Sequence, residues 1–337
     1  MSSAAPTLPP ADVPEEAASP DRRPVKKRML IIVNPYATTV SDRLKSLVVY
    51  ALQGRYEVEA VSTEAQNHAT EIGREAVNGG YDVVVAFGGD GTLNEVANGL
   101  AGTDLPVAVL PGGSTNVVCR TLGMPNDVVD ATEHLLSLAD DWQPRKIDLG
   151  MVDDRYFVFA CGVGIDATVV RRVDSNPKLK ASAGPYYYSW AGVSGFYRKY
   201  LLNPIRVKTT VDGHEPVEGI TTIVQNSDPF TYFASRPIRV CEGIGIDDGT
   251  LSMAVLKRAA QRDMPTLLSR LFSGTRTAAQ HKQVAHFDDV THAVVETAST
   301  AKDGTPRPFP LQVDGDYIGE RDRVELRAAP SALTIVA

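Results

Sequence analysis

The sequence predicts an α/β domain built on a doubly wound parallel sheet, followed by a β-sandwich-like, mainly antiparallel second domain. Two observations predict the first domain. Valine-rich apolar runs alternate with helical patterns up to about residue 138, and two of these runs end in glycine-rich turns. Short loops between alternating strands and helices are typical of a parallel sheet covered on both faces. The second domain is predicted by the alternating apolar and polar runs and the Asp-Gly pairs that begin near residue 145.

The expected domain limits follow from these changes of pattern. Residues 1–27 are rich in Pro, Ala, Glu and Asp and lack any hydrophobic period, so we expect a disordered tail. Its basic cluster at 22–28 is typical of a solvated tail, although contact with anionic lipid is an alternative. We expect the α/β domain at 28–144, the β-rich domain at 145–320, and a C-terminal strand at 321–337 that returns toward the first domain.

The elements of the first domain follow from periodicity. The helix at 42–53 is predicted by Leu44, Leu47, Val48 and Leu52, which share one helical face before Gly54. The same reasoning, with apolar runs read as strands, predicts strands at 29–33, 56–62, 83–87 and 105–110 and helices at 42–53, 68–78, 92–100 and 127–138.

The stretch 83–98 is the most informative part of the chain. A valine-rich strand leads into three glycines within four positions, and a helix follows in which Thr92 is the expected N-cap and Glu95 completes a capping box. Such a turn directs backbone N–H groups and a positive helix end at an anion, usually a phosphate. Asp90 stands inside this cradle, and its carboxylate would repel phosphate unless a divalent cation lay between them. The stretch therefore predicts a Mg²⁺-nucleotide site.

A second glycine-rich turn, at 111–116, follows the next predicted strand. Ligands of doubly wound sheets bind beyond the carboxyl ends of the strands, where Asn34 and Thr63 are also expected to lie. The convergence of these turns on one sheet edge strengthens the prediction of a nucleotide-phosphate site.

The second half predicts strands at 146–152, 156–160, 205–211, 220–224, 251–256 and 310–313, with a strand-like stretch at 324–336. Asp-Gly pairs at 212–213, 248–249, 303–304 and 314–315 are hairpin signals. Two helical stretches, 165–173 and 185–202, interrupt the strands. The aromatic residues of the second stretch suit either a packed core or a water–lipid boundary. Asp166, at the start of the first stretch, either faces a cleft or caps the helix.

Composition excludes several classes of function. The net charge of −7, without a dominant basic region, argues against nucleic acid as the main partner. The three cysteines lie far apart, without disulfide-framework or zinc spacing, which favours a reducing compartment. No apolar run reaches transmembrane length, and the first residues lack a signal-peptide core. We therefore expect a cytoplasmic protein.

The stretches Gly88-Gly89-Asp90-Gly91-Thr92-Leu93-Asn94-Glu95 and Leu110-Pro111-Gly112-Gly113-Ser114-Thr115-Asn116 resemble those of the bacterial diacylglycerol kinase-like lipid kinases. This family shares its fold with NAD kinases and sphingosine kinases, and the likeness runs from about Met29 to the end of the chain. It implies an NAD kinase-like α/β domain, a β-sandwich domain, and ATP with Mg²⁺ between them. It also implies a lipid substrate taken from the membrane surface, peripheral membrane association and a homodimer.

The resemblance also assigns roles to residues. It gives ATP contacts to Asn34, Pro35, Tyr36, Ala37, Thr63, Gly88, Gly89, Asp90, Gly91, Thr92, Leu93, Asn94 and Thr115. Gly245, Asp248 and Thr250 match the loop that holds a structural Mg²⁺, with Asp248 supplying the carboxylate. Asp316 matches the base that deprotonates the lipid hydroxyl, and it acts beside Asp90 in catalysis. The chain departs from the family pattern at two places: Asp316 stands where many relatives carry Glu, and Val117 where Asp is common.

The chemistry is coherent without the family. The chain has neither a Walker Gly-x-x-x-x-Gly-Lys-Ser/Thr motif nor the protein-kinase signature, so backbone amides and Mg²⁺ must stabilise the transferred phosphate. The leading interpretation is an ATP-dependent kinase that phosphorylates diacylglycerol. The alternatives are a kinase of ceramide or a sphingoid base, an NAD kinase, and a nucleotide-binding regulatory protein with weak or no transfer activity.

Overall fold

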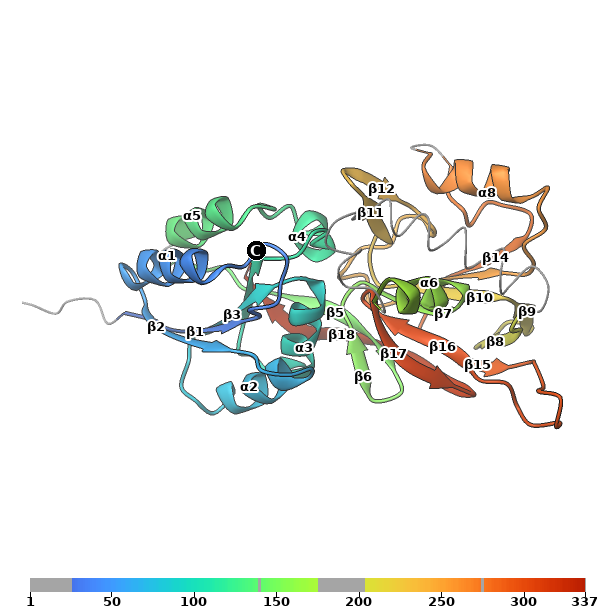
Figure 1. Ribbon diagram of the computed structural model, residues 1–337, viewed down its shortest axis with the longest axis horizontal. Coiled ribbons are helices and arrows are strands. Elements are labelled where there is room, and N and C mark those ends of the chain that lie inside the picture. Colours follow the sequence, from blue (N-terminus) through green and yellow to red (C-terminus); the bar gives the residue numbers. More distant parts are fainter. Residues whose placement is uncertain (1–25, 139–140, 175–203, 274–275, 337) are drawn as a thin grey trace, which may run out of the picture.

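The computed structural model describes residues 26–138, 141–174, 204–273 and 276–336. An α/β part lies on the left of Figure 1 and a β-rich part on the right. The aromatic stretch 185–202 and nearly all of the tail expected at 1–27 lie outside the described residues. Within the described ranges, no helix is both long enough and apolar enough to cross a bilayer.

Four parallel strands form the sheet of the first part in the order β2-β1-β3-β4, and every residue of β3 and β4 is buried. The strands are β1 (Arg28–Val33), β2 (Glu57–Ser62), β3 (Val83–Gly88) and β4 (Val107–Pro111). The helices are α1 (Asp42–Gln53), α2 (His68–Ala76), α3 (Asp90–Leu100), α4 (Val117–Thr121) and α5 (Val128–Leu138). One apolar cluster joins the sheet to α2 and α3, and another joins its other face to α1 and α5. The doubly wound domain is confirmed.

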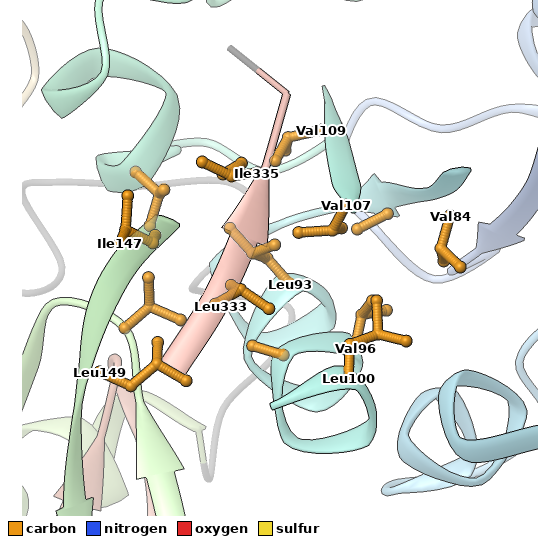
Figure 2. Packing of buried hydrophobic residues seen from close by; sticks show 14 of the residues in the cluster. Val84, Leu93, Val96, Leu100, Val107, Val109, Ile147, Leu149, Leu333 and Ile335 are labelled. Atoms are coloured by element: carbon orange, nitrogen blue, oxygen red, sulfur yellow. The ribbon is translucent and has the colours of Figure 1, made fainter. Parts of the chain in front are cut away.

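The last strand, β18 (Arg323–Ile335), continues this sheet into the second part of the molecule. Its end pairs in parallel with β4, and its body pairs antiparallel with β5 (Arg145–Val152) and β15 (His292–Thr297). The sheet also contains β6 (Arg155–Phe157), β8 (Val207–Val211) and β9 (Val217–Gly219). Figure 2 shows Leu333 and Ile335 of β18 between the side chains of β4 and β5, with α3 beside them. The two parts therefore share one sheet of ten strands.

A second, wholly antiparallel sheet packs against the far half of the first. Its order is β14-β13-β10-β7-β16-β17. The bounds are β7 (Ala160–Gly164), β10 (Thr221–Gln225), β13 (Leu251–Leu256), β14 (Val284–Val290), β16 (Phe309–Val313) and β17 (Asp316–Arg321). Residues of both sheets form one buried cluster, as a β-sandwich requires. The remaining elements are the hairpin β11 (Thr231–Phe233) and β12 (Arg236–Ile238) and the helices α6 (Ile165–Asp174) and α8 (Met264–Leu271). The mainly antiparallel second domain is confirmed.

The capping box expected at Thr92 and Glu95 is wrong. Helix α3 begins two residues earlier, at Asp90, with Gly89 as its N-cap. The carboxylate of Glu95 instead accepts hydrogen bonds from the backbone N–H groups of Asn67 (2.8 Å) and Ala69 (3.1 Å) at the start of α2. Asn67 caps α2 without a side-chain hydrogen bond of its own, so the neighbouring helix supplies the acceptor.

The hairpin expected at Asp248-Gly249 is also wrong. This pair lies in the loop before β13, and the preceding strand β12 pairs with β11 and not with β13. The pairs at 212–213 and 314–315 do join antiparallel neighbours, β8 with β9 and β16 with β17. The pair at 303–304 lies in a turn closed by a bridge between Thr300 and Pro306.

Candidate active site

The loops predicted to bind phosphate meet at one edge of the parallel sheet. The N–H of Thr63 donates to the carbonyl of Val33 at 2.8 Å, and the N–H of Asn34 donates to that of Phe87 at 2.9 Å. The N–H of Gly112 donates to the carbonyl of Gly88 at 2.7 Å. The carboxyl ends of all four parallel strands are thus aligned. The structure brings together residues that the sequence placed in four separate loops.

The two glycine-rich turns touch through their backbones. A Cβ added at Gly113 would lie 2.9 Å from the Cα of Gly89, and one at Gly112 would lie 3.0 Å from the Cα of Gly88. Real Cβ atoms essentially never approach closer than 3.0 Å, so a side chain at Gly113 would require the turns to shift. A Cβ at Gly112 would also lie 2.7 Å from Cγ2 of Val40. The result is a surface of backbone that a phosphate group can approach closely.

The remaining predicted nucleotide residues surround these turns in different ways. Asn34 donates through Nδ2 to Oγ1 of Thr92 at 3.1 Å and accepts from the N–H of Tyr36, whose side chain is 84% exposed. Pro35 is exposed, whereas Ala37 and Thr115 are partly buried near the turns. Leu93 packs in the core beneath the sheet. Its side chain therefore supports the first glycine-rich turn from the side of the apolar core.

Asp90 connects the first glycine-rich turn to the helix that follows the second one. It is the first residue of α3, and its Oδ1 accepts from the backbone N–H of Val118 at 3.3 Å, at the start of α4. The pKa of Asp90 is raised to about 6, chiefly by burial; the amides of Val117 and Val118 act to lower it, and the carboxylates of Asp314 and Asp316 act to raise it. A cation would relieve this concentration of negative charge.

The donor set fits Mg²⁺ shared with a nucleotide. Among the described residues, no three His, Cys, Asp or Glu side chains form a metal-binding cluster. Mg²⁺ is commonly bound by one or two carboxylates together with substrate phosphates and waters, so a protein cage is not required. Asp90 can supply such a carboxylate beside the glycine-rich turns.

Asp314 anchors the turn between β16 and β17 to the first domain. Its carboxylate accepts from the backbone N–H groups of Val158 (2.7 Å), Phe159 (2.9 Å) and Ala160 (3.0 Å) and from Nδ2 of Asn94 in α3 (2.7 Å). Burial nevertheless raises the pKa of Asp314 above its usual value. These four bonds fix the position of the turn relative to α3.

Asp316, two residues further along, lies against the nucleotide turn. A Cβ added at Gly91 would overlap Oδ2 of Asp316, so this carboxylate sits on the first turn of α3. The predicted base and the predicted phosphate cradle come from distant parts of the sequence and meet here. A hydroxyl placed between them could lose its proton to Asp316 while attacking a phosphate on the turn.

The predicted metal loop forms a separate small site. Oδ2 of Asp248 accepts from the N–H of Gly245 at 2.5 Å, and Asp248 and Thr250 both line a pocket of about 160 Å³. Asp148 accepts from the N–H of Gly249 at 2.5 Å and from that of Ser331 at 2.7 Å, which fixes this loop to β18. Glu242, Asp288 and Asp289 line the same pocket, so several carboxylates and the hydroxyl of Thr250 surround it. Oxygen donors of this kind suit Mg²⁺ that keeps several waters.

Sequence reasoning missed the side chains that support the β16–β17 turn. Nη2 of Arg155 donates to Oδ1 of Asn94 at 2.8 Å, and Nε2 of Gln312 donates to Oδ2 of Asp166 at 2.7 Å. Burial raises the pKa of Asp166 to about 6, and Gln312 also accepts from the N–H of Gly315 at 2.9 Å. The sequence left two roles open for Asp166, facing a cleft or capping a helix. The structure places it in the first turn of α6, where its carboxylate accepts from Gln312 of β16. No local pattern links residues so far apart in the chain.

Comparisons with known proteins identify the family. The model of the diacylglycerol kinase catalytic domain matches residues 28–152, and that of the YegS C-terminal NAD kinase beta sandwich-like domain matches residues 160–337, more than half of the chain. The chain belongs to the diacylglycerol kinase family. The resemblance in the sequence is thereby confirmed, and the chain is placed among lipid kinases at the level of the family.

Relatives of this family match nearly the whole chain. Diacylglycerol kinases of Staphylococcus aureus strains RF122 and MRSA252 are each 27% identical over 305 residues, which is 88% of both chains. A solved diacylglycerol kinase of Bacillus anthracis is 19% identical, with a TM-score of 0.66 over 92% of this chain and 96% of that one. A second Bacillus anthracis structure is 23% identical, with a TM-score of 0.68 and the same coverage. The solved structures establish that the fold is shared.

Proposed function

We propose that this protein is an ATP- and Mg²⁺-dependent kinase that transfers the γ-phosphate of ATP to the hydroxyl of diacylglycerol, giving phosphatidic acid. The observation that carries the proposal is the contact between Asp316 and the first turn of α3. A carboxylate beside a glycine-rich phosphate cradle is the pairing that phosphoryl transfer to an alcohol requires. The family to which the chain belongs supports the same class of acceptor.

In this mechanism the first N–H groups of α3 bind the phosphates, because a helix start leaves donors without partners within the helix. The glycines of the two turns let the phosphates approach the backbone closely. Mg²⁺, when bound, neutralises phosphate charge. Asp90 is the residue whose carboxylate would hold it. Asp316 accepts the proton of the acceptor's hydroxyl as that oxygen bonds to the γ-phosphorus, and ADP leaves with the electrons of the broken P–O bond.

Three side chains keep Asp316 in place for this step. Asp314 ties the turn to residues 158–160 and to Asn94, and Gln312 holds the N–H of Gly315. The acceptor oxygen must lie between a fixed base and a fixed phosphate, and small displacements of either group cost rate. We propose that the turn is rigid for this reason. The structural Mg²⁺ proposed at Asp248 would stabilise the neighbouring loop.

Because diacylglycerol resides in bilayers, we propose that the enzyme associates peripherally with a membrane, on the cytoplasmic side expected from the sequence. The homodimer expected from the resemblance stays a prediction. Sphingoid bases and ceramide also carry a hydroxyl next to apolar chains, and one methylene provides only about 1–3 kcal/mol of discrimination. They are therefore tested as competing acceptors.

The test is a transfer assay with γ-labelled ATP and Mg²⁺, using diacylglycerol, ceramide and sphingosine in mixed micelles and NAD⁺ in solution. We expect labelled phosphatidic acid from the wild type and none from Asp90→Ala, with both proteins folded. If only ceramide or only sphingosine became labelled, that lipid would replace diacylglycerol as the proposed acceptor. Labelled NADP⁺ would contradict the lipid-kinase proposal, and ATP turnover without any labelled acceptor would favour a regulatory protein.

A further inference from the structure

We propose that α8 and the tip of the β11–β12 hairpin form a docking face for an anionic lipid bilayer. The docking face consists of Phe233, Arg236, Leu268, Arg270 and Phe272. The proposal rests on the proposed function, since a kinase of membrane lipids must reach its substrate at a bilayer surface. It names the surface by which the enzyme does so.

The apolar part of the docking face lies on a short helix. Leu268 in α8 is 44% exposed, and Phe272, the C-cap residue that follows the helix four positions later, is 45% exposed. Leu267 is buried and packs with Val240, Cys241 and Ala254. The helix is thus held to the second sheet by one side while it presents two large apolar side chains on another.

The segment that carries α8 is rich in basic residues in an otherwise acidic protein. The acidic side chains of Asp228 and Glu242 line a pocket with Arg239 and Arg276 next to this segment. Residues 257–282 contain a single acidic residue, Asp263, and the following basic residues: Lys257, Arg258, Arg262, Arg270, Arg276 and Lys282. Asp263 is buried, pairs with Nζ of Lys282 at 3.1 Å and also interacts with Arg258 and Arg262. Arg270, the one arginine of α8, is not among its partners. The whole chain carries a net charge of −7. Exposed apolar side chains flanked by arginines are typical of helices that lie in the interface of an anionic bilayer.

A chain of contacts connects the docking face to the nucleotide turns. The ring of Phe272 meets that of Phe233 edge-on at 5.8 Å between centroids. The adjacent Tyr232 lies under the guanidinium of Arg120, 4.8 Å away, and Nη1 of Arg120 donates to the carbonyl of Ala234 at 2.9 Å. Arg120 belongs to α4, whose first turn bonds Asp90.

The arrangement of α4, α8 and the β11–β12 hairpin would allow one membrane surface to lie along all three. The hairpin β11–β12 stands between α4 and α8 along the upper edge of Figure 1. A bilayer bound at α8 and the hairpin tip would therefore lie, in this view, on the same side as α4, the helix that follows the second glycine-rich turn. Docking would bring the acceptor lipid to the side of the molecule that carries α4.

The first test is co-sedimentation with vesicles of phosphatidylcholine alone and of equimolar phosphatidylcholine and phosphatidylglycerol, without ATP. We expect the wild type to bind the anionic vesicles and to release with added salt. Replacing both Leu268 and Phe272 by Ser should weaken binding at least about tenfold, given the apolar area that these side chains would bury. Arg270→Gln should weaken it roughly fivefold, the contribution typical of one arginine at an anionic surface.

A matched control lies at the other end of the molecule. Leu47 and Tyr50 on α1 are 57% and 79% exposed, and replacing both by Ser should leave vesicle binding unchanged. The melting temperature of each variant is measured to establish folding. The proposal would be overturned if the wild type bound anionic vesicles no better than phosphatidylcholine vesicles. It would also be overturned if the α1 variant lost binding and the α8 variant did not. An α8 variant that binds vesicles normally but changes the oligomeric mass would overturn it too, since the face would then bind a second copy.

Binding and catalysis are separated by a second measurement. Transfer to a short-chain, water-soluble diacylglycerol does not require a bilayer, so the α8 variant should match the wild type on this acceptor and lose activity only on vesicles. Because vesicle binding is measured without ATP, a failure of the proposed kinase function leaves that result intact. An α8 variant impaired equally on both acceptors would overturn the docking role.

Discussion

Gly91 is the residue at which the nucleotide turn meets the second domain. A side chain there would collide with the carboxylate of Asp316, which is the end of a rotatable side chain and can turn away. We therefore expect Gly91→Ala to reduce the rate of transfer roughly 10–100-fold, the range typical of a reacting group displaced by about an ångström. The melting temperature should change little. Steady-state kinetics and a thermal melt measure both quantities.

The control for this prediction is the double variant. In an Asp316→Asn background the base is already lost, so adding Gly91→Ala should cause little further decrease in rate. A Gly91→Ala enzyme with wild-type kcat would show that Asp316 does not act from this position.

Asp166 provides a prediction about pH. Its folded pKa of about 6 lies above the usual value for Asp because the carboxyl is buried. The stability that its protonated form contributes is complete below the unfolded pKa of about 4 and is lost as pH rises through about 6. Asp166→Asn keeps an acceptor for Gln312 and never ionises. We expect its melting temperature to exceed that of the wild type by more at pH 8 than at pH 5; an equal difference at both pH values would contradict the burial of this carboxyl.

At the scale of single elements, the β16–β17 turn depends on Asp314. Asp314→Asn retains a residue that tolerates the positive φ of 48° but replaces a carboxylate oxygen by an N–H₂ group facing donors. We expect a loss of about 2–4 kcal/mol in the free energy of unfolding, because buried backbone N–H groups lose their acceptor. Urea denaturation measures this loss.

Asp303 serves as the matched control, since it also precedes a glycine in a turn. It is exposed, and its carboxylate accepts only from the N–H and hydroxyl of Thr305 among the bonds of the described residues. Asp303→Asn should change the free energy of unfolding by about 0.5 kcal/mol or less. Equal losses in the two variants would refute the anchoring role of Asp314.

The elements that local patterns specify were predicted, and those that depend on distant partners were not. The strands β1, β3 and β13 and the helices α1 and α3 follow from runs or periodicities within the segment itself. Helix α8 was missed although Met264, Leu267, Leu268 and Leu271 stand at helical spacing, because the segment has only eight residues and buries only Leu267 fully. Strands β14 and β15 were missed because charged residues interrupt their apolar runs.

The same distinction applies to the candidate site. Glycine-rich turns and strand ends are local, so the phosphate cradle could be predicted, and the resemblance directed attention to Asp316. The hydrogen bonds of Asp314 to residues 158–160 and the contact of Glu95 with α2 arise only from packing. From the sequence, Asp314 was indistinguishable from an ordinary turn former.

For the whole molecule, β18 predicts cooperative unfolding. Its first half belongs to the sandwich, and its end lies in the core of the α/β domain, with Leu333 and Ile335 fully buried. We expect calorimetry to show one transition, since neither domain can lose this strand and remain intact. Leu333→Ala should lower the stability of the entire molecule by about 2–5 kcal/mol. Two separate transitions, with only one moved by the substitution, would contradict this expectation.

The central claim is that two domains joined by one sheet bring a carboxylate to a phosphate cradle. The most direct test is single-turnover transfer of the γ-phosphate from ATP to diacylglycerol by the wild type and by Asp316→Asn, with ATP binding measured in parallel. We expect the variant to bind ATP as the wild type does and to transfer phosphate about 10²–10⁴-fold more slowly, the range typical of a lost general base. Transfer at the wild-type rate by Asp316→Asn would contradict the claim.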